Sequence, residues 1–150
     1  MMRASNVRIQ TEDFDSGVET RALTKGRSDV GAVVTFVGVV RGDEELKSMR
    51  LEHYPAMTSR EIEAHISDAE TRWPLLGIRV VHRVGELKPG ENIVFVGVAS
   101  AHRHAAFEAA SFLMDYLKTN APFWKFEERA AGGDWVMSRC EDEEALKRWR

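Results

Sequence analysis

Hydrophobic and polar positions follow two periods along this chain, and each change of period marks the border of an expected element. Residues that are β-branched or that alternate in polarity predict strands, at 6–10, 31–40, 49–54, 78–84, 92–99, 123–129 and 135–138. Helical spacing and charged runs between turn signals predict helices, at 16–25, 58–73, 101–119 and 141–150. The segment Lys88-Pro89-Gly90 separates two of the strands and is typical of a tight hairpin turn. Because helices and strands alternate irregularly, we expect an α+β fold with a mixed, mostly antiparallel sheet.

Three segments carry sharper expectations. Gly31–Val40 is apolar almost throughout, which predicts a strand buried on both faces. Thr58 and Glu61 have the spacing of a capping box, so the helix there is expected to begin at Thr58. Ser100 is expected to cap the next helix, which Asn120-Ala121-Pro122 ends. The residues of these two helices expected to face the core are Ile62, Ile66, Ala69 and Trp73 in the first and Phe107, Ala110, Met114 and Leu117 in the second.

Composition narrows the class of protein. The chain has 150 residues, of which 43% are hydrophobic and 30% charged, and this suits a single domain with one core. Within it we expect an N-terminal strand and helix region over 1–27 and a C-terminal tail over 140–150. A net charge of −3 argues against a general nucleic-acid coat, which needs a basic excess. Since no apolar run approaches the ~20 residues of a spanning helix and the first residues lack an apolar signal core, we expect a cytoplasmic protein without a membrane partner.

Cysteine and histidine usage excludes further kinds of site. Cys140 is the only cysteine, so the chain can form neither an internal disulfide nor a cysteine-based zinc site. Cys140 also lies next to an acidic run, which raises a thiol pKa and disfavours a role as nucleophile. His102 and His104 are two residues apart and do not share a helix face, so no metal site is expected.

A candidate anion site lies where a buried strand leads into a helix. His102 and Arg103 occupy this place, where backbone amides and the positive end of the helix dipole favour anions. The guanidinium of Arg103 adds a forked donor suited to phosphate. A solvated helix start with ordinary polar residues is the alternative, and residue types alone favour it.

Two lysines and an arginine are further candidates. Lys118 is expected at a helix end and Lys125 among aromatic residues of the next strand, where a lysine pKa can fall far enough for base or nucleophile chemistry. Their ordinary alternatives are a favourable helix C-terminus for Lys118 and a snorkelling side chain for Lys125. Arg41 follows a buried strand and is expected at a sheet end, unless it pairs with Asp43 or Glu44 on the surface.

Several sequence blocks resemble the family of large, catalytic subunits of molybdopterin synthase, the MoaE family. The resemblance covers roughly residues 28–150 in order. Its blocks are Gly31-Ala32-Val33-Val34-Thr35-Phe36 with Arg41, Leu51-Glu52-His53-Tyr54-Pro55-Ala56-Met57, Trp73-Pro74, His82-Arg83-Val84-Gly85-Glu86-Leu87, Val94–Ser100, Ser100-Ala101-His102-Arg103, Asp115-Tyr116-Leu117-Lys118, Ala121-Pro122-Phe123-Trp124-Lys125 and Trp135.

The resemblance implies a sulfurtransferase that works without a metal or organic cofactor. It implies that cyclic pyranopterin monophosphate is converted to molybdopterin by two sulfurs, which come from the C-terminal glycine thiocarboxylate of a small ubiquitin-like partner. It also implies an α/β-hammerhead-like fold with an added β subdomain, and a homodimer at the core of a heterotetramer. The site would draw on both copies of the chain.

The resemblance also implies roles for particular residues. Lys118 and Lys125 would be catalytic, and Phe36 and Met114 would form the pocket wall. The positions that match substrate-binding ones are Val39, Val40, Arg41, His102, Arg103, Lys118, Lys125, Phe126, Glu127 and Arg139.

This chain departs from the family pattern near the proposed anion site. Val39 stands where a lysine is common, Phe126 stands where a basic residue is common, and the loop 41–49 is short. These changes remove positive charge from the phosphate contacts and leave the lysines untouched. A noncatalytic module that docks the tail of a ubiquitin-like protein is the alternative function, and it would not need lysines that converge with an anion site.

Overall fold

The computed structural model describes residues 6–119, 123–130, 132–136 and 140–149, which form two four-stranded sheets and four helices. Sheet A has the strand order β1 (Asn6–Gln10), β4 (Gly77–Arg83), β6 (Asn92–Ser100) and β2 (Ala32–Val39). Sheet B has the order β5 (Gly85–Leu87), β3 (Leu46–His53), β7 (Phe123–Arg129) and β8 (Gly132–Val136). The helices are α1 (Ser16–Ala22), α2 (Pro55–Arg72), α3 (Arg103–Thr119) and α4 (Cys140–Lys147).

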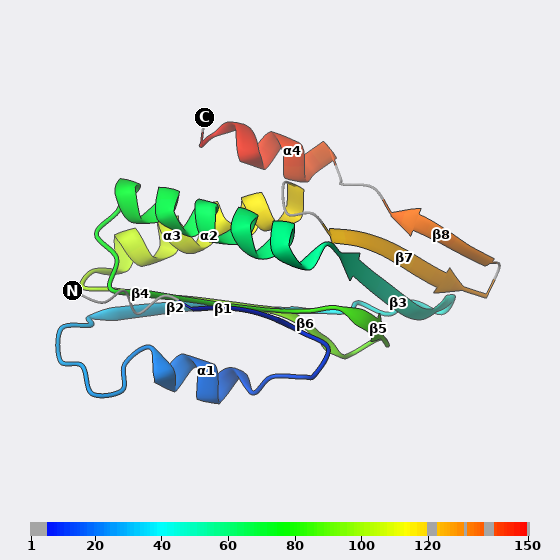
Figure 1. The fold of residues 1–150 in the computed structure, drawn as a ribbon, viewed down its shortest axis with the longest axis horizontal. Helices are drawn as coiled ribbons and strands as arrows, with labels where there is room; N and C mark the ends of the chain where they lie inside the picture. The colour runs from blue at the N-terminus through cyan, green and yellow to red at the C-terminus, as the bar shows by residue number, and fades with distance from the viewer. Residues whose placement is uncertain (1–5, 120–122, 131, 137–139, 150) are drawn as a thin grey trace.

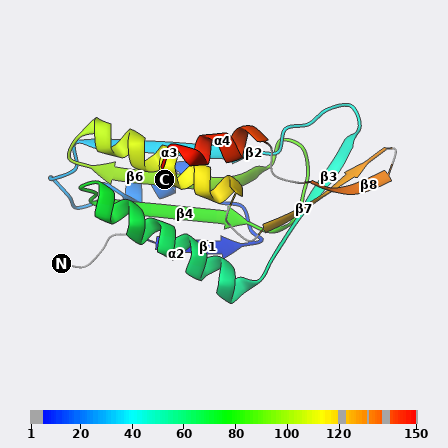
Figure 2. The same cartoon turned by 90° about the horizontal axis from the view of Figure 1, so that it is seen from above.

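The layers are plain in Figure 1. Helices α2 and α3 cover one face of sheet A, α1 covers the other, and α4 lies outside α3. Seen from above, sheet B continues beyond one end of sheet A (Figure 2). Only β1 and β4 pair in parallel, so the expected mixed, mostly antiparallel α+β fold is confirmed, with sheet B as the added β subdomain.

Two hydrophobic clusters hold the sheets together. The larger lies between sheet A and helices α2 and α3, and it includes the fully buried residues Ile62, Val80, Val96 and Phe112. Four buried alanines of α3, which are Ala105, Ala106, Ala109 and Ala110, let this helix lie close to the sheet. The smaller cluster joins Val40, Leu46, Leu51 and Leu87 beside sheet B. Ile93 packs against both clusters.

The hairpin predicted around residues 88–90 is confirmed. Strands β4 and β6 pair antiparallel from Gly77 with Ala99 to His82 with Val94. The turn closes through the amide of Glu91, which donates to the Lys88 carbonyl at 3.0 Å, and Gly90 has φ +91°. The left-handed conformation at Gly90 is one that side-chain-bearing residues rarely adopt. Strand β5 is inserted into this connection and belongs to sheet B.

The strand over 31–40 is not buried on both faces, and this expectation is wrong for the single chain. Strand β2 is the edge of sheet A, where β6 is its only pairing partner in the described sheet. Phe36, Val37 and Val39 are 38%, 37% and 46% exposed. An apolar strand left at an open edge needs cover from another molecule.

The expected helix starts are also wrong. Helix α2 begins at Pro55, three residues before Thr58, because proline is well suited to the first helical turn. The Thr58 hydroxyl donates to the Tyr54 carbonyl at 2.8 Å and forms no capping box. The Ser100 hydroxyl donates to the Pro74 carbonyl at 2.8 Å, while α3 starts at Arg103.

Other boundaries differ by a few residues. The helix expected over 16–25 ends at Ala22, the strand expected over 49–54 spans Leu46–His53, and the last strand spans Gly132–Val136. Phe107 is 62% exposed, so it does not face the core, whereas Ala110 does. The helix end expected at 120–122 lies outside the described residues.

The start of β2 lies close to the turn that leads into α3. The Gly31 amide donates to the Ser100 carbonyl at 3.0 Å. A Cβ on Gly31 would meet the Ala101 backbone oxygen at 2.1 Å, far inside a normal contact. Only glycine therefore fits here without a shift of the turn that carries His102.

We predict that Gly31→Ala lowers the free energy of unfolding by about 1–3 kcal/mol, because the backbone must move to admit the methyl group. Urea denaturation followed by circular dichroism measures this. Gly17→Ala is the matched control, since a Cβ there meets only the ends of the Asp15 and Arg21 side chains. Equal stability of Gly31→Ala and wild type would contradict the close approach.

Candidate active site

The two sheets meet at Phe123, the first residue of β7. Its ring stacks on the imidazole of His82 at the end of β4, with centroids 3.8 Å apart and planes at 15°. The ring of His53, in β3, lies 6.0 Å from Phe123. Side chains two apart on a strand share a face, so Lys125 lies on the same face of β7 as Phe123.

Both candidate lysines affect the pKa of one residue, His82. It is buried, and its Nδ1 lies 2.8 Å from the Arg83 carbonyl. The pKa of His82 is lowered to about 4, mainly by burial, with smaller contributions from the positive charges of Lys125 and Lys118 and an opposing one from the hydrogen bond to Arg83. The imidazole is therefore neutral near pH 7. Both lysines therefore lie within electrostatic range of one buried ring at the end of β4.

The loop after β2 reaches this same region. Val40 donates its amide to the Glu91 carbonyl and accepts from the Gly90 amide, both at 2.8 Å. Val40 is buried in the cluster that contains Leu51, and Leu51 is directly paired with Lys125. Paired residues share a sheet face, so Val40 lies on the Lys125 side of sheet B. Arg41 follows it and is exposed.

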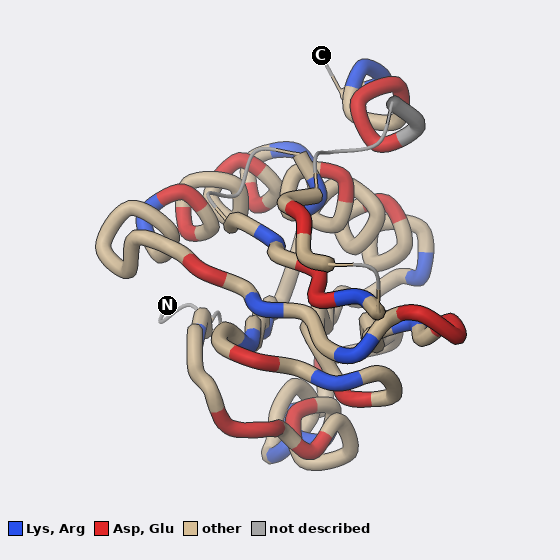
Figure 3. The backbone as a smooth tube through the Cα atoms, turned by 90° about the vertical axis from the view of Figure 1, so that its right-hand side faces the viewer, with Lys and Arg blue, Asp and Glu red and all other residues tan. Residues whose placement is uncertain are grey.

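Acidic and basic residues are interspersed along the strands at the sheet B end (Figure 3). Arg129 bonds to Asp43 at 3.0 Å and to Glu127 at 2.6 Å, which ties the loop after β2 to β7. The hydrogen bond from Arg129 holds the pKa of Asp43 below its usual value. Asp43 therefore pairs with Arg129, and the alternative in which it pairs with Arg41 is not what the structure shows.

Phe126 points to the opposite face of sheet B. The Arg50 guanidinium lies 5.0 Å above its ring, and the Trp135 ring lies 5.1 Å away. Phe126 lines a pocket of about 460 Å³ on this outer face. The other lining residues are Lys47, Ser48, Arg50, Glu86, Lys88 and Glu128. The structure does not bring the Phe126 side chain to the lysines.

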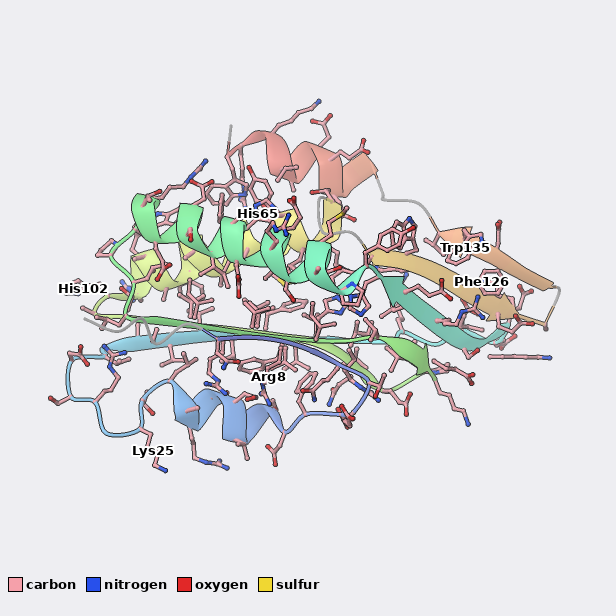
Figure 4. All side chains as sticks on the ribbon, viewed as in Figure 1. Arg8, Lys25, His65, His102, Phe126 and Trp135 are labelled. Carbon is pink, nitrogen blue, oxygen red and sulfur yellow. The ribbon has the colours of Figure 1, made fainter. Side chains whose placement is uncertain are left out.

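His102 and Arg103 lie at the far end of α3. Figure 4 shows His102 at the opposite end of the molecule from Phe126 and Trp135. Fifteen residues of helix separate Arg103 from Lys118, which is about 22 Å at ~1.5 Å per residue. Both His102 and Arg103 are exposed. Within one chain, the expected anion site and the lysines are apart.

Three expected site residues remain, which are Phe36, Met114 and Arg139. Phe36 is paired with Val96, so it lies on the face of sheet A that α2 and α3 cover, near the open edge of the sheet. Met114 is half-buried and packs against the same cluster. Arg139 lies outside the described residues.

Sequence reasoning missed His82 and Phe123 as parts of this region. The available signal was a histidine directly after the apolar pair Val80-Val81 of a strand, since a buried polar group needs a reason to be there. Among the described residues, no three of histidine, cysteine, aspartate and glutamate come together in a way that could hold a metal ion. No helix in the described part of the chain is long and apolar enough to cross a membrane.

Comparison with known proteins identifies the family. The family model described as "MoaE protein" matches residues 9–120. The molybdopterin synthase catalytic subunit of Mesorhizobium japonicum is 55% identical over 150 residues, which cover 98% of this chain and 94% of that protein. The solved structure of the molybdopterin biosynthesis MoaE protein from Burkholderia ambifaria has a TM-score of 0.84 and 46% identity over 97% of each chain.

A more distant structure shares the fold. It is a complex of subunits 1 and 2 of the molybdopterin-converting factor from Helicobacter pylori, with a TM-score of 0.73 and 18% identity over 91% of this chain and 92% of that chain. Sequence and fold agree over nearly the whole length, and the chain belongs to the MoaE family.

Proposed function

We propose that this chain is the catalytic subunit of a molybdopterin synthase, a sulfurtransferase of molybdenum cofactor biosynthesis. It converts cyclic pyranopterin monophosphate to molybdopterin with two sulfurs, one from each of two thiocarboxylated molecules of a small partner. The observation that carries the proposal is 55% identity to a named catalytic subunit, and it is supported by the positive charges of Lys118 and Lys125 acting on one buried histidine. A cytoplasmic location is part of the proposal.

The chemistry explains why two lysines are needed. Attack of a thiocarboxylate sulfur on the pterin side chain builds negative charge and requires proton transfers. An ammonium group next to the reacting atoms stabilises that charge, and the same group can deliver a proton. Lys118 and Lys125 take these roles in our proposal. In our proposal Val39, Glu127 and the backbone of Val40, whose side chain is buried, line the approach on the Lys125 face, and Phe36 and Met114 form the pocket wall.

The phosphate of the substrate needs cations as well. We assign this role to His102 and Arg103, with Arg41 and Arg139 as further contacts. A helix N-terminus supports it, because its free amides and dipole favour anions. Since α3 separates Arg103 from the lysines of its own chain, we infer that a second copy supplies His102 and Arg103 to each site.

The open edge of β2 supports such a dimer. Val37 and Val39 are exposed there, and Phe107 is exposed on α3, which packs over β6 and β2. A two-fold contact between two β2 edges sets the neighbouring α3 helices antiparallel. The Arg103 end of one helix then lies toward the Lys118 end of the other.

The partner subunit completes the proposal. The Helicobacter pylori structure is a complex of two different subunits, which supports a small partner for this chain as well. In our proposal the partner is ubiquitin-like, and its thiocarboxylated tail reaches the lysines, one partner at each end of the dimer. A noncatalytic docking module would need only a groove for the tail, and two lysines around a buried histidine would serve no purpose in it.

We predict that Lys118→Ala and Lys125→Ala each reduce sulfur transfer by about 10²–10⁴, the usual loss for one proton-transfer group. Single-turnover conversion of the cyclic pterin by the complex with thiocarboxylated partner measures this. Lys88→Ala is the matched control, because Lys88 lies on the outer face of sheet B and should leave the rate unchanged. Near-normal sulfur transfer by a folded Lys125→Ala protein would contradict the catalytic role of Lys125.

We predict that the wild-type chain sediments at twice its 17.0 kDa mass at micromolar concentration. Val37→Lys should shift it to the monomer, because a charge on each β2 edge is repelled across the two-fold contact. The control is Val18→Lys, another exposed valine, which lies on α1. A wild-type monomer, or a Val37→Lys dimer as stable as wild type, would contradict the β2 contact.

A further inference from the structure

His82 is a polar residue placed where an apolar one is expected. In β4 it pairs with Val94 of β6 and Ile9 of β1, both hydrophobic. Its side chain is 6% exposed. A phenylalanine would satisfy the stack on Phe123 without the cost of burying two ring nitrogens. The nitrogens therefore call for a separate explanation.

The orientation of the imidazole is fixed by Arg83. A carbonyl can only accept, so Nδ1 carries the hydrogen that it donates to the Arg83 oxygen. Arg83 is itself held in place, since its guanidinium donates to the Thr11 carbonyl at 3.0 Å and to the Asn92 carbonyl at 3.0 Å. In the neutral ring the lone pair is thus at Nε2, at the far side from the Arg83 carbonyl.

The charged and titratable groups around His82 are mainly cations. Lys125 comes from β7, Lys118 from α3 and His53 from β3, and Arg83 is its neighbour on β4. A second positive charge on His82 would repel the lysines. A neutral ring with an unprotonated Nε2 offers instead an acceptor for an ammonium group.

We propose that His82 is a positioning residue for sulfur transfer. Its ring, stacked on Phe123, sets where β7 of sheet B begins beside the end of β4, and its Nε2 lone pair accepts a hydrogen bond from a lysine ammonium during the reaction. The proposal rests on the proposed function, because it concerns the same two lysines. It assigns to His82 no contact with the substrate.

Two substitutions of His82 test the stacking of its ring and the acceptor role of Nε2 separately. His82→Phe keeps the stack and removes the acceptor, whereas His82→Gln places an amide oxygen near the position of Nε2. We expect His82→Phe to lower kcat about tenfold or more with an unchanged KM for the pterin, and His82→Gln to recover part of it. The basic limb of the kcat profile should move to lower pH in His82→Phe, because the acceptor stabilises the charged lysine.

The matched control is His65→Phe. His65 also lies against an aromatic ring, that of Tyr116, with centroids 4.2 Å apart and planes tilted by 31°, but it lies between α2 and α3. Its substitution should leave kcat and the pH profile unchanged. A folded His82→Phe enzyme with wild-type kcat and pH profile would overturn the proposal. A wild-type complex that transfers no sulfur would instead overturn the proposed function.

A second measurement does not depend on the folding of a His82 variant. Nitrogen chemical shifts of histidine-labelled protein give the tautomer and the pKa of His82 directly. We expect hydrogen on Nδ1, and a higher pKa for His82 in Lys118→Ala and Lys125→Ala, because each removes a repelling charge. Lys88→Ala should change nothing. A His82 pKa that is the same in wild type and both lysine variants would show that the ring does not face the lysines.

Discussion

The rigidity of α3 is the constraint on which the rest of the site depends. Its buried alanines, with Phe112 and Leu113, pack the continuous helix against the core, and its two ends cannot approach each other. Arg103 is fixed at one end and Lys118 at the other, about 22 Å apart. A phosphate-bearing substrate of ordinary size cannot touch both in one chain. The apolar, open edge of β2 beside α3 is the feature through which a second copy can bring the two ends together.

The second constraint is the joint between the sheets. Phe123 stacks on His82, and this contact sets the direction in which β7 carries Lys125 away from sheet A. Arg129, on the same strand, bonds to Asp43 and so fixes the loop after β2 to the same face. Lys125 and the loop thus share one side of sheet B. The opposite side carries Phe126, Arg50 and Trp135, which contact one another.

Local signals predicted much of this fold. Strands β1 and β7 have the bounds expected from alternation alone, and the turn at Pro89-Gly90 follows from residue chemistry. The burial of β2 was mispredicted because an apolar strand has the same sequence whether its neighbour is in its own chain or in another. The start of α2 was mispredicted because Pro55 and Thr58 both signal a helix start, and proline came first.

The site was less predictable than the fold. Residues adjacent on a strand face opposite sides, so alternation alone separates Phe126 from Lys125, although the resemblance put both on the site. The stack of Phe123 on His82 joins strands 41 positions apart in the chain, and no local pattern predicts such a contact. The length of α3 was readable from the sequence, but its consequence for Arg103 and Lys118 appears only with the helix in place.

The most direct test of the two-copy site is complementation between inactive variants. Chains with Lys125→Ala and chains with Arg103→Ala are co-expressed with different tags, and dimers that carry both tags are purified. In such a dimer one site has both wild-type groups and the other has neither. A two-copy site predicts that sulfur transfer returns to about half the wild-type rate per dimer, although each parent is nearly inactive. Mixed dimers no more active than their parents would show that Arg103 and Lys125 act within one chain, and would contradict it.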